Sequence, residues 1–272
     1  MPEPTATDSA HTAPPADKSA PFTGNAAPLT GKAALVTGAA RRVGAVIARA
    51  LHTAGASVVL HYRSSTEEAA ALAGELNSVR PRSAALEQCD LLDGAAVTEL
   101  AHAATAAFGG LDILVNNAST FYPTPVGDIE EHDWNDLIGT NLKAPLFLAQ
   151  AAAAALRERG GLIVNLADIH GVRPLRRHPV YCIAKAGLIM LTKSLARELG
   201  PQVRVNAIAP GPVMWPEDGV DAALRDEIIA RTALKRIGSA EDVARAVVFF
   251  ATEAPFVTGQ ILAIDGGRSI GW

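Results

Sequence analysis

Short runs of apolar residues alternate with longer amphipathic stretches along most of this chain. The first apolar run, Ala33–Val36, ends at Thr37-Gly38 and is followed by an amphipathic segment from Val43 to Ala54. Alternation of a strand-length run with a helix-length stretch predicts β-α-β units, in which the strands are parallel. The other predicted strands are Ser57–Tyr62, Ala84–Cys89, Asp112–Asn116, Leu162–Leu166, Val203–Ile208 and Ile261–Ile264.

The amphipathic stretches between these runs predict helices with recognisable ends. Asp93 is expected to cap a helix that runs to Phe108, and Ser239 a helix with carboxylates in its first turn. The other predicted helices are Thr66–Val79, a helix near Asp133–Arg159, and Val180–Leu199. Because no break interrupts the alternation, we expect one α/β domain with a doubly wound parallel sheet of about seven strands.

The first 30 residues differ from the rest of the chain. They are rich in Ala, Pro, Ser and Thr and show no hydrophobic periodicity. A segment of this composition buries too little apolar surface to offset the entropy of ordering it, so residues 1–30 are predicted to be a disordered tail. A targeting role for the tail stays open, although it lacks the features of a secretory signal. The folded domain is expected to occupy residues 31–272.

Composition excludes several classes of function. The chain of 272 residues is 49% hydrophobic and 19% charged, with a net charge of −4, which gives no electrostatic reason to expect nucleic acid. The two cysteines, Cys89 and Cys182, form no motif that predicts a metal site or a disulfide framework, which suits a reducing cytoplasm. No run of about 18 apolar residues predicts a membrane-spanning helix.

A glycine-containing loop joins the first predicted strand to its helix. Gly38 permits a tight turn, Gly44 permits close packing of helix and strand, and the helix N-terminus offers N–H groups to a pyrophosphate. Arg41 and Arg42 add cations. The second strand ends in Tyr62-Arg63-Ser64 with no carboxylate to hold a free ribose hydroxyl. A pocket with cations and hydroxyls suits a 2′-phosphate and therefore predicts NADPH rather than NADH. The alternative is that Arg63 is simply solvated.

Tyr181 and Lys185 lie four residues apart at the start of a predicted helix, so both side chains point to the same face. An ammonium beside a phenol favours the phenolate, so we expect the pKa of Tyr181 to fall below its usual value of about 10. Tyr181 is therefore the candidate acid or base.

From Lys32 to Arg268 the chain resembles the short-chain dehydrogenase/reductase family, a family with Rossmann-type domains. The matching motifs are Thr37-Gly38…Gly44, Asn116-Asn117-Ala118, Asn141, Tyr181-x-x-x-Lys185, Asn206 and Pro210-Gly211. The resemblance implies that Tyr181 donates a proton, that Lys185 holds the nicotinamide ribose, and that Asn141 anchors a water in the proton relay. With the loop residues above, the predicted cofactor contacts are Gly38, Arg41, Arg42, Val43, His61, Tyr62, Arg63, Ser64, Asp90, Leu91, Asn117, Ala118, Tyr181, Lys185, Pro210 and Gly211.

One position departs from the family pattern. A serine usually stands thirteen residues before the tyrosine, and this chain has Asp168 there. A carboxylate that faces a developing alkoxide raises the activation barrier, because the two negative charges repel. An amino group or a protonated ring nitrogen instead donates a hydrogen bond to the carboxylate. Asp168 therefore favours reduction of a C=N bond over a ketone; the alternative is an aspartate that caps nearby backbone.

The pteridine reductases, a branch of this family, share that aspartate and also Leu60-His-Tyr-Arg63 and Asn116-Asn-Ala-Ser-Thr-Phe-Tyr-Pro-Thr-Pro125. The resemblance implies that Phe121 stacks the pterin against the nicotinamide, that Arg42 bridges cofactor and pterin, and that Asp168 and Tyr181 contact the pterin. Phe121 as a core-filling aromatic is the alternative. Met214 and Trp215 lie in the family's substrate loop and are candidate lid residues over an aromatic substrate.

These features predict NADPH-dependent reduction of a dihydropterin, namely dihydrobiopterin, dihydromonapterin or dihydrofolate. A carbonyl or 3-oxoacyl reductase and a non-catalytic NADPH-sensing regulator are the alternatives. The resemblance implies a homotetramer in which the helices Asp133–Arg159 and Val180–Leu199 pair across a two-fold axis.

Overall fold

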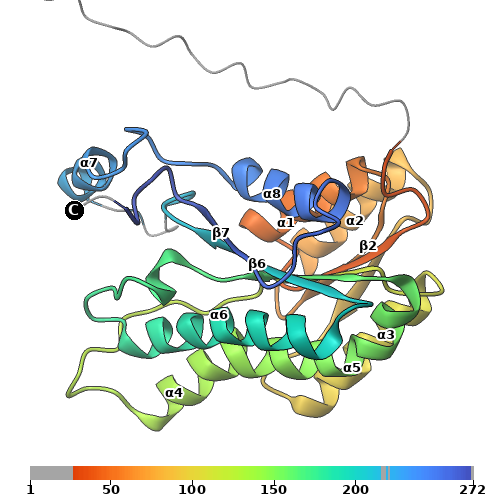
Figure 1. Ribbon diagram of the computed structural model, residues 1–272, viewed down its shortest axis with the longest axis horizontal. Coiled ribbons are helices and arrows are strands. Elements are labelled where there is room, and N and C mark those ends of the chain that lie inside the picture. The colour runs from red at the N-terminus through yellow and green to blue at the C-terminus, as the bar shows by residue number, and fades with distance from the viewer. Residues whose placement is uncertain (1–26, 216–218, 220, 271–272) are drawn as a thin grey trace, which may run out of the picture.

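A computed structural model describes residues 27–215, 219 and 221–270. Seven parallel strands form one sheet in the order β3-β2-β1-β4-β5-β6-β7 (Figure 1). Because the strand order reverses between β1 and β4, the predicted doubly wound α/β fold is confirmed. The strands are β1 (Ala33–Val36), β2 (Ser57–Tyr62), β3 (Ala84–Gln88), β4 (Ile113–Asn116), β5 (Leu162–Leu166), β6 (Arg204–Pro210) and β7 (Ile261–Ile264).

Helices cover both faces of the sheet. They are α1 (Arg42–Thr53), α2 (Thr66–Val79), α3 (Gly94–Ala107), α4 (Glu131–Ile138), the π-turn η1 (Gly139–Lys143), α5 (Ala144–Arg159), the 3-10 turn η2 (Ile169–Gly171), α6 (Pro179–Leu199), α7 (Ala222–Ala230) and α8 (Ala240–Thr252). In Figure 1 α1, α2 and α8 lie above the sheet and α3, α5 and α6 below it.

Alternating side chains of the strands divide the core into two layers. Val36 and Leu60 face the layer that α1, α2 and α8 cover, whereas Leu35 and Val59 face the layer under α3, α5 and α6. Successive residues of a strand point to opposite faces, so a sheet covered on both sides needs nearly continuous apolar strands. Both faces of the sheet are thereby covered by helices, and its carboxyl edge is the part that the two layers do not cover.

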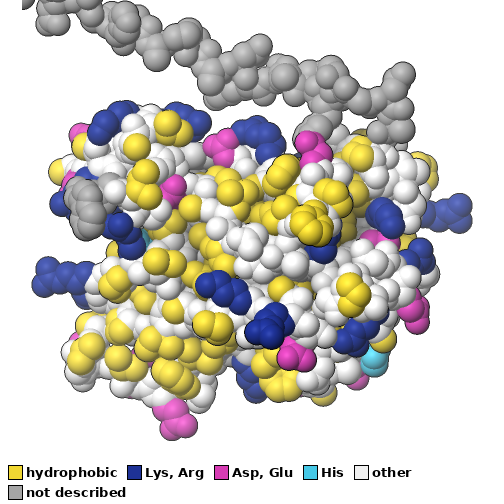
Figure 2. Space-filling view, viewed as in Figure 1, with side chains coloured by type: hydrophobic (Ala, Val, Ile, Leu, Met, Phe, Trp, Pro, Cys, Tyr) yellow, Lys and Arg dark blue, Asp and Glu magenta, His cyan; other side chains and the backbone are white. Residues whose placement is uncertain are grey.

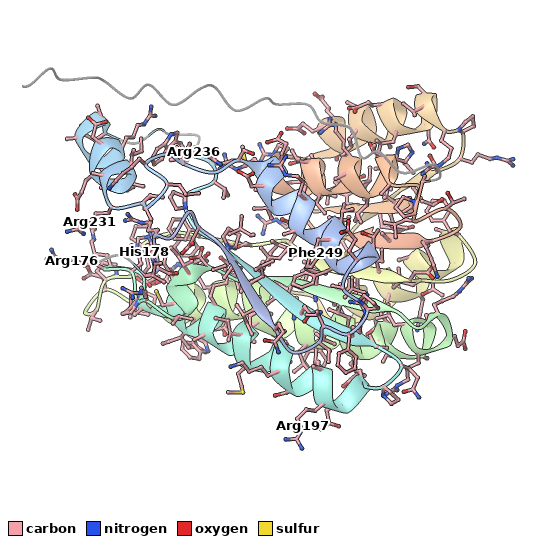
Figure 3. The ribbon with its side chains drawn as sticks, turned by 45° about the horizontal axis from the view of Figure 1, so that its top comes forward. Arg176, His178, Arg197, Arg231, Arg236 and Phe249 are labelled. Carbon is pink, nitrogen blue, oxygen red and sulfur yellow. The ribbon has the colours of Figure 1, made fainter. Side chains whose placement is uncertain are left out.

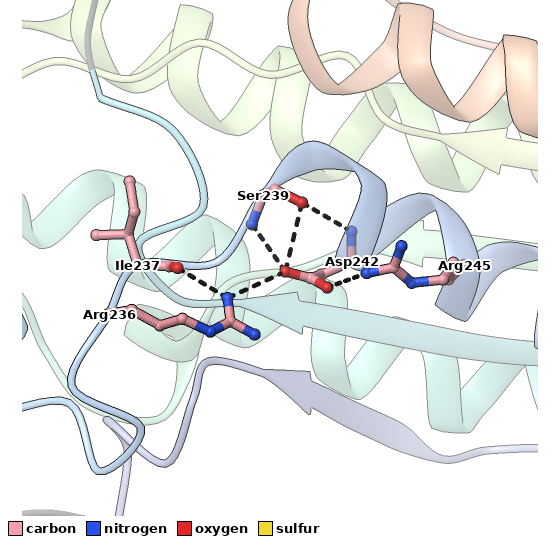
Figure 4. Close-up of polar contacts among 5 residues, drawn as sticks. All are labelled: Arg236, Ile237, Ser239, Asp242 and Arg245. Carbon is pink, nitrogen blue, oxygen red and sulfur yellow. Dashed lines mark hydrogen bonds and ion pairs between the residues drawn. The ribbon is translucent and has the colours of Figure 1, made fainter. Parts of the chain in front are cut away.

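The predicted helix caps are present. The Asp93 side chain accepts hydrogen bonds from the backbone N–H groups of Ala95 and Ala96, at 2.9 and 3.3 Å. Ser239 and Asp242 form a reciprocal capping box at the start of α8, with the Asp242 carboxylate accepting from the Ser239 N–H at 2.9 Å (Figure 4). Arg236 and Arg245 flank that carboxylate, and together with the capping hydrogen bonds they hold its pKa below the usual value despite the opposing effect of burial.

Residues 1–26 lie outside the described residues, so most of the predicted tail is not addressed by the structure. The last four residues of that prediction, 27–30, belong to the folded domain instead. Leu29 is only 4% exposed, and its N–H donates to Ala54 O at 2.8 Å. The domain therefore begins before residue 31. Leu29, a single leucine among polar and small residues, is buried next to the end of α1.

Two helical features differ from the sequence-based expectation. The helix predicted near Asp133–Arg159 is interrupted by the π-turn η1, and α7 follows the substrate loop without having been predicted. The short helix α7 buries no residue fully, so hydrophobic periodicity gives little signal for it.

Within the described residues, α6 alone is long and apolar enough to span a membrane by length and composition. It packs against β6, η1 and η2, and its buried residues include Tyr181 and Lys185. Buried core helices of globular domains meet the same criterion, and the sequence analysis did not anticipate that α6 would.

Candidate active site

A cleft of about 490 Å³ runs along the carboxyl edge of the sheet. Open α/β sheets bind ligands at this edge, where the strand order reverses. Every residue predicted to contact the cofactor lines this cleft, as do Asp168 and Met214. Three predicted site residues lie outside its lining: Asn141, Phe121 and Trp215.

The phosphate loop between β1 and α1 has the geometry expected of an anion cradle. Gly38 adopts a φ of +62°, and a Cβ on Gly44 would lie only 2.1 Å from Gly38 O. Arg41 at the start of α1 makes no capping side-chain hydrogen bond, and the first turn contains no carboxylate. The residue before the helix thus does not cap its N-terminus, an arrangement that suits the binding of an anion there. Arg42 has a φ of +52°, a strained conformation for a residue other than glycine.

His61 supports this loop from the next strand. Its Nδ1 accepts the Gly38 N–H at 3.1 Å, and its Nε2 lies 3.3 Å from Cys89 O. The ring is 2% exposed, and burial lowers its pKa to about 4. His61 is therefore neutral, with Nδ1 as acceptor and Nε2 as donor.

Asn117 fixes the loop from the other side. Its Nδ2 donates to Thr37 O at 2.8 Å and to Gly38 O at 3.1 Å. The side chain therefore holds the turn that the predicted phosphate contacts depend on, in addition to lining the cleft. The glycine cradle, the uncapped helix N-terminus and the cations Arg41, Arg42 and Arg63 together fit the phosphates of a nicotinamide dinucleotide.

Tyr181, Asp168 and Lys185 meet at the other end of the cleft. The Tyr181 hydroxyl donates to Asp168 Oδ2 at 2.8 Å, and the Lys185 ammonium donates to Leu166 O at 2.9 Å. Asp168 Oδ1 accepts the His170 N–H at 2.7 Å. Asp168 thus caps nearby backbone with Oδ1, as the alternative interpretation expects, while its Oδ2 accepts the hydrogen bond from Tyr181.

The expected shift of the Tyr181 pKa is wrong in direction. Tyr181 is 5% exposed, and burial together with the Asp168 carboxylate raises its pKa well above the usual value. Lys185 does not offset this, because its ammonium points to Leu166 O and lies 5.6 Å from the centre of the Tyr181 ring. Burial lowers the pKa of Lys185 to about 8. Tyr181 is therefore protonated at neutral pH, as a proton donor must be.

Asn141 lies in the π-turn η1, behind the cleft. Its Nδ2 donates to Leu137 O at 2.9 Å and to Thr120 O at 3.0 Å. In a regular α-helix the backbone N–H of residue 141 would occupy Leu137 O, so the side chain substitutes for the bond that the widened turn displaces. Ser119, which lines the cleft, donates to Asn141 Oδ1 at 2.6 Å and was missed by the sequence analysis.

Phe121 lies against Tyr181, a residue of the cleft, and is 51% exposed, which rules out a core-filling role. Its ring stacks in parallel on His178 at a centroid distance of 4.7 Å and an interplanar angle of 9°. Its ring also meets Tyr181 edge-on at 4.8 Å. His178 is not among the site residues that the sequence predicts. Its spacing of three residues before Tyr181, which places both near one helix face, was the available signal.

Trp215, one of the two lid candidates, contacts the phosphate loop through its backbone oxygen. The Arg42 guanidinium donates to Trp215 O at 3.0 Å, and the Arg225 guanidinium of α7 lies 5.3 Å from the Trp215 ring centre. Arg42 thus joins the loop of β1 to the substrate loop after β6. Among the residues described, no group of three or more His, Cys, Asp or Glu side chains is placed to hold a metal ion.

Comparison with known proteins adds to this geometry. Residues 38–269 match the family model described as enoyl-(acyl carrier protein) reductase. Pteridine reductase 1 of Leishmania tarentolae is 38% identical over 270 aligned positions, covering 85% of this chain and 93% of that protein. The 3-oxoacyl-[acyl-carrier-protein] reductase FabG of Staphylococcus aureus is 36% identical over 231 positions, covering 84% and 94%. An uncharacterized short-chain type dehydrogenase/reductase of Sinorhizobium fredii is 34% identical, covering 85% and 93%.

Proposed function

The chain belongs to the short-chain dehydrogenase/reductase family and is an oxidoreductase that uses a nicotinamide cofactor, and from this premise we propose that it reduces dihydropterins to tetrahydropterins with NADPH. Pteridine reductase 1 and the 3-oxoacyl reductase have similar identities to this chain, so the proposal rests on the chemistry of the site rather than on the degree of similarity.

The observation that supports a pterin is the hydrogen bond between Tyr181 and Asp168, at 2.8 Å. A ketone acquires negative charge on oxygen as it is reduced, and a carboxylate beside that oxygen opposes the reaction. An amino-pyrimidine ring offers N–H donors, for which a carboxylate is a suitable acceptor. The pair therefore suits a substrate with a C=N bond and neighbouring N–H groups.

Each residue of the pair has a defined task in the proposed reaction. NADPH, when bound, supplies the hydride. Tyr181 holds a proton because its pKa is raised, and it delivers that proton to the reduced ring nitrogen. Asp168 accepts the ring's N–H donors and orients the phenol. Lys185, which lines the cleft and donates to Leu166 O, would bind the ribose hydroxyls.

The end of β2 supports NADPH over NADH. Arg63 and Ser64 line the cleft where the acidic residue of an NADH site would stand. A guanidinium and a hydroxyl are suitable partners for a 2′-phosphate. Comparable Michaelis constants for the two cofactors would contradict this part of the proposal.

A substrate panel tests the proposed reaction. Consumption of NADPH is followed by absorbance with dihydrobiopterin, dihydromonapterin and dihydrofolate, and with 3-oxoacyl thioesters. We expect turnover of the dihydropterins, and a loss of about a hundredfold in kcat/KM with Asp168→Ser, since removing one charged acceptor costs roughly 3 kcal/mol. Glu99→Ser is the control, because it also removes one negative charge but at an exposed position on α3. Turnover of thioesters or ketones alone would establish the second candidate, a carbonyl or 3-oxoacyl reductase.

We also propose a homotetramer that works in the cytoplasm. Figure 2 shows hydrophobic side chains gathered at the lower left of one face. Large apolar side chains exposed on α5 and α6 support the association. These exposed residues are Leu146, Phe147, Ile183 and Met190. Sedimentation equilibrium tests the assembly, and cell fractionation tests the location.

A further inference from the structure

A polar side chain of α6 meets a polar side chain of β5 inside the core layer that α3, α5 and α6 cover. Asn165 Nδ2 donates to Thr192 Oγ1 at 2.9 Å, and Thr192 Oγ1 donates to Leu188 O at 2.8 Å. Asn165 and Thr192 are both fully buried. We propose that these two are positioning residues, which fix where α6 lies along the sheet and thereby place Tyr181 and Lys185 for the reaction.

The link extends further into the sheet. Asn116 of β4 is the register partner of Asn165, and its Nδ2 donates to Asn165 Oδ1 at 2.8 Å. The two asparagines stand two residues after Leu114 and Ile163, which belong to the layer under α6, so they point to the same layer. A row of hydrogen bonds therefore crosses from β4 through β5 to α6.

Two other hydrogen bonds join α6 to this part of the chain, and both involve groups of the reaction centre. They run from Tyr181 to Asp168 and from Lys185 to Leu166 O. In the proposed reaction Tyr181 gives its hydroxyl proton to the substrate, so that bond cannot hold the helix throughout a turnover. Thr192 lies seven residues after Lys185, on the same face of α6 and outside the lining of the cleft. Its bond to β5 can therefore stay intact while the others change.

Apolar packing alone defines the position of this helix less sharply. The helix packs chiefly over β6, and the residues of the same face on either side of Thr192 are the apolar Leu188 and Leu195. Apolar contact is not directional, so it tolerates a small shift better than a hydrogen bond does. A shift would also leave the buried Asn165 amide without this partner, which is costly. The pair therefore disfavours other positions of α6.

The anchor and the reaction centre lie in different parts of α6. Figure 3 labels a residue near each end of the helix, with His178 just before its start and Arg197 near its end. Tyr181 and Lys185 lie in the first two turns, whereas Thr192 lies beyond the middle. Hydrogen bonds in both parts restrict sliding and rotation of the helix. This matters because a displacement of about 1 Å can cost on the order of 10²-fold in rate.

The test separates the hydroxyl of Thr192 from its methyl group. Thr192→Val keeps the shape and removes the hydroxyl, whereas Thr192→Ser keeps the hydroxyl and removes the methyl group. Thr105→Val on α3 is the control, because Thr105 Oγ1 also donates to the carbonyl four residues back, at 2.8 Å, and within the described residues bonds to no other side chain. For each variant kcat and KM are measured with the dihydropterins, the dissociation constant for NADPH by fluorescence quenching, and Tm by thermal unfolding.

Thr192→Val should lower kcat about tenfold and raise the dissociation constant for NADPH about fivefold, because Lys185 moves with the helix. KM for the dihydropterin should change by less than about twofold, since the loss lies in alignment rather than in binding of that substrate. Thr192→Ser should keep kcat and the dissociation constant within about twofold of the wild type. Both variants should lower Tm by about 3 °C, one through an unpaired amide and the other through a small cavity. Thr105→Val should leave the kinetic values unchanged.

The inference rests on the proposed reaction centre and applies equally to dihydropterin and carbonyl reduction, and the outcomes keep the two proposals apart. A Thr192→Val variant with the kcat and NADPH affinity of the wild type would overturn it. Equal losses in Thr192→Val and Thr192→Ser would also overturn it, because activity would then follow packing rather than the hydrogen bond. A wild type that reduces no dihydropterin would overturn only the proposed function, and the affinities for NADPH would still decide the inference. Should Thr192→Val not fold, Thr192→Ala takes its place, because it leaves room for a water beside the Asn165 amide.

Discussion

The nucleotide end of the cleft is formed mainly by backbone groups, and the substrate end by side chains. At the nucleotide end, Gly38, Gly44 and the first turn of α1 present backbone groups from one continuous β-α-β unit. At the substrate end the site is made of side chains from three segments. Phe121 comes from the loop before α4, Asp168 from the turn after β5, and His178 and Tyr181 from the start of α6. The phosphate loop itself is local in sequence, although the Asn117 side chain holds it from 80 residues further along the chain. The substrate end has no such local unit and is assembled from segments up to about sixty residues apart.

This difference predicts which kind of substitution should damage each end. A cradle of backbone groups depends on the absence of side chains, so adding one atom should damage it. A site made of side chains depends on their chemical identity, so a substitution there should change the reaction and leave the fold intact. The following predictions test that contrast.

The largest effect is expected at the substrate end, from Tyr181→Phe. Removing the hydroxyl removes the proton donor and should lower kcat by about 10³-fold, in the range of general acid catalysis. Binding of NADPH, measured by quenching of protein fluorescence, should be unchanged. Undiminished turnover would show that another group delivers the proton, and complete absence of turnover in the wild type would instead favour a cofactor-sensing protein.

Gly44→Ala should have the next largest effect, at the nucleotide end. The new Cβ would lie 2.1 Å from Gly38 O and 2.6 Å from Asn117 Nδ2, so the loop must shift, at a cost of about 3 kcal/mol. Affinity for NADPH and the melting temperature should both fall. Gly74→Ala is the matched control, because a Cβ on Gly74 in α2 meets nothing within 4 Å. Equal results for the two variants would contradict the cradle.

The pH dependence of stability should reveal His61. Its pKa of about 4 in the folded protein lies below the usual value, so the unfolded chain binds the proton more tightly. Stability should therefore fall as the pH drops from about 6.5 toward 4, by about 2 kcal/mol between pH 7 and 5. Urea unfolding at the two pH values should show this loss in the wild type and a smaller loss in His61→Gln. The same loss in both would remove His61 as its source.

The smallest effect is expected from Arg63→Ala. Loss of one exposed guanidinium from the 2′-phosphate should cost about 1 kcal/mol, which is roughly a fivefold rise in KM for NADPH. KM for NADH should not change, and Lys193→Ala, an exposed cation on α6, should alter neither. A parallel rise for both cofactors would mean that Arg63 contacts a group common to both.

Several errors of the sequence analysis fall at the substrate end or in the elements that lead to it. The sequence predicts a lowered pKa for Tyr181 from the spacing to Lys185, but spacing does not reveal that the ammonium is held by Leu166 O. It predicts one helix across residue 139, but a π-turn lies there, and its Asn141 side chain donates to Thr120 O in the loop before α4, a contact that helical periodicity does not reveal. Helix α7 was missed because it buries no residue fully, and periodicity reports burial.

The sequence by itself determined the seven strands, most of the helices between them, the phosphate loop, and the residue types of the reaction centre. These follow from hydrophobic periodicity and from glycines at fixed spacing, which act over a few residues. Only the tertiary structure decided that Asp168 accepts a hydrogen bond from the Tyr181 hydroxyl, that His178 covers Phe121, and that Leu29 belongs to the domain. Burial and contact between distant segments set those features, and neither is encoded in the spacing of neighbouring residues.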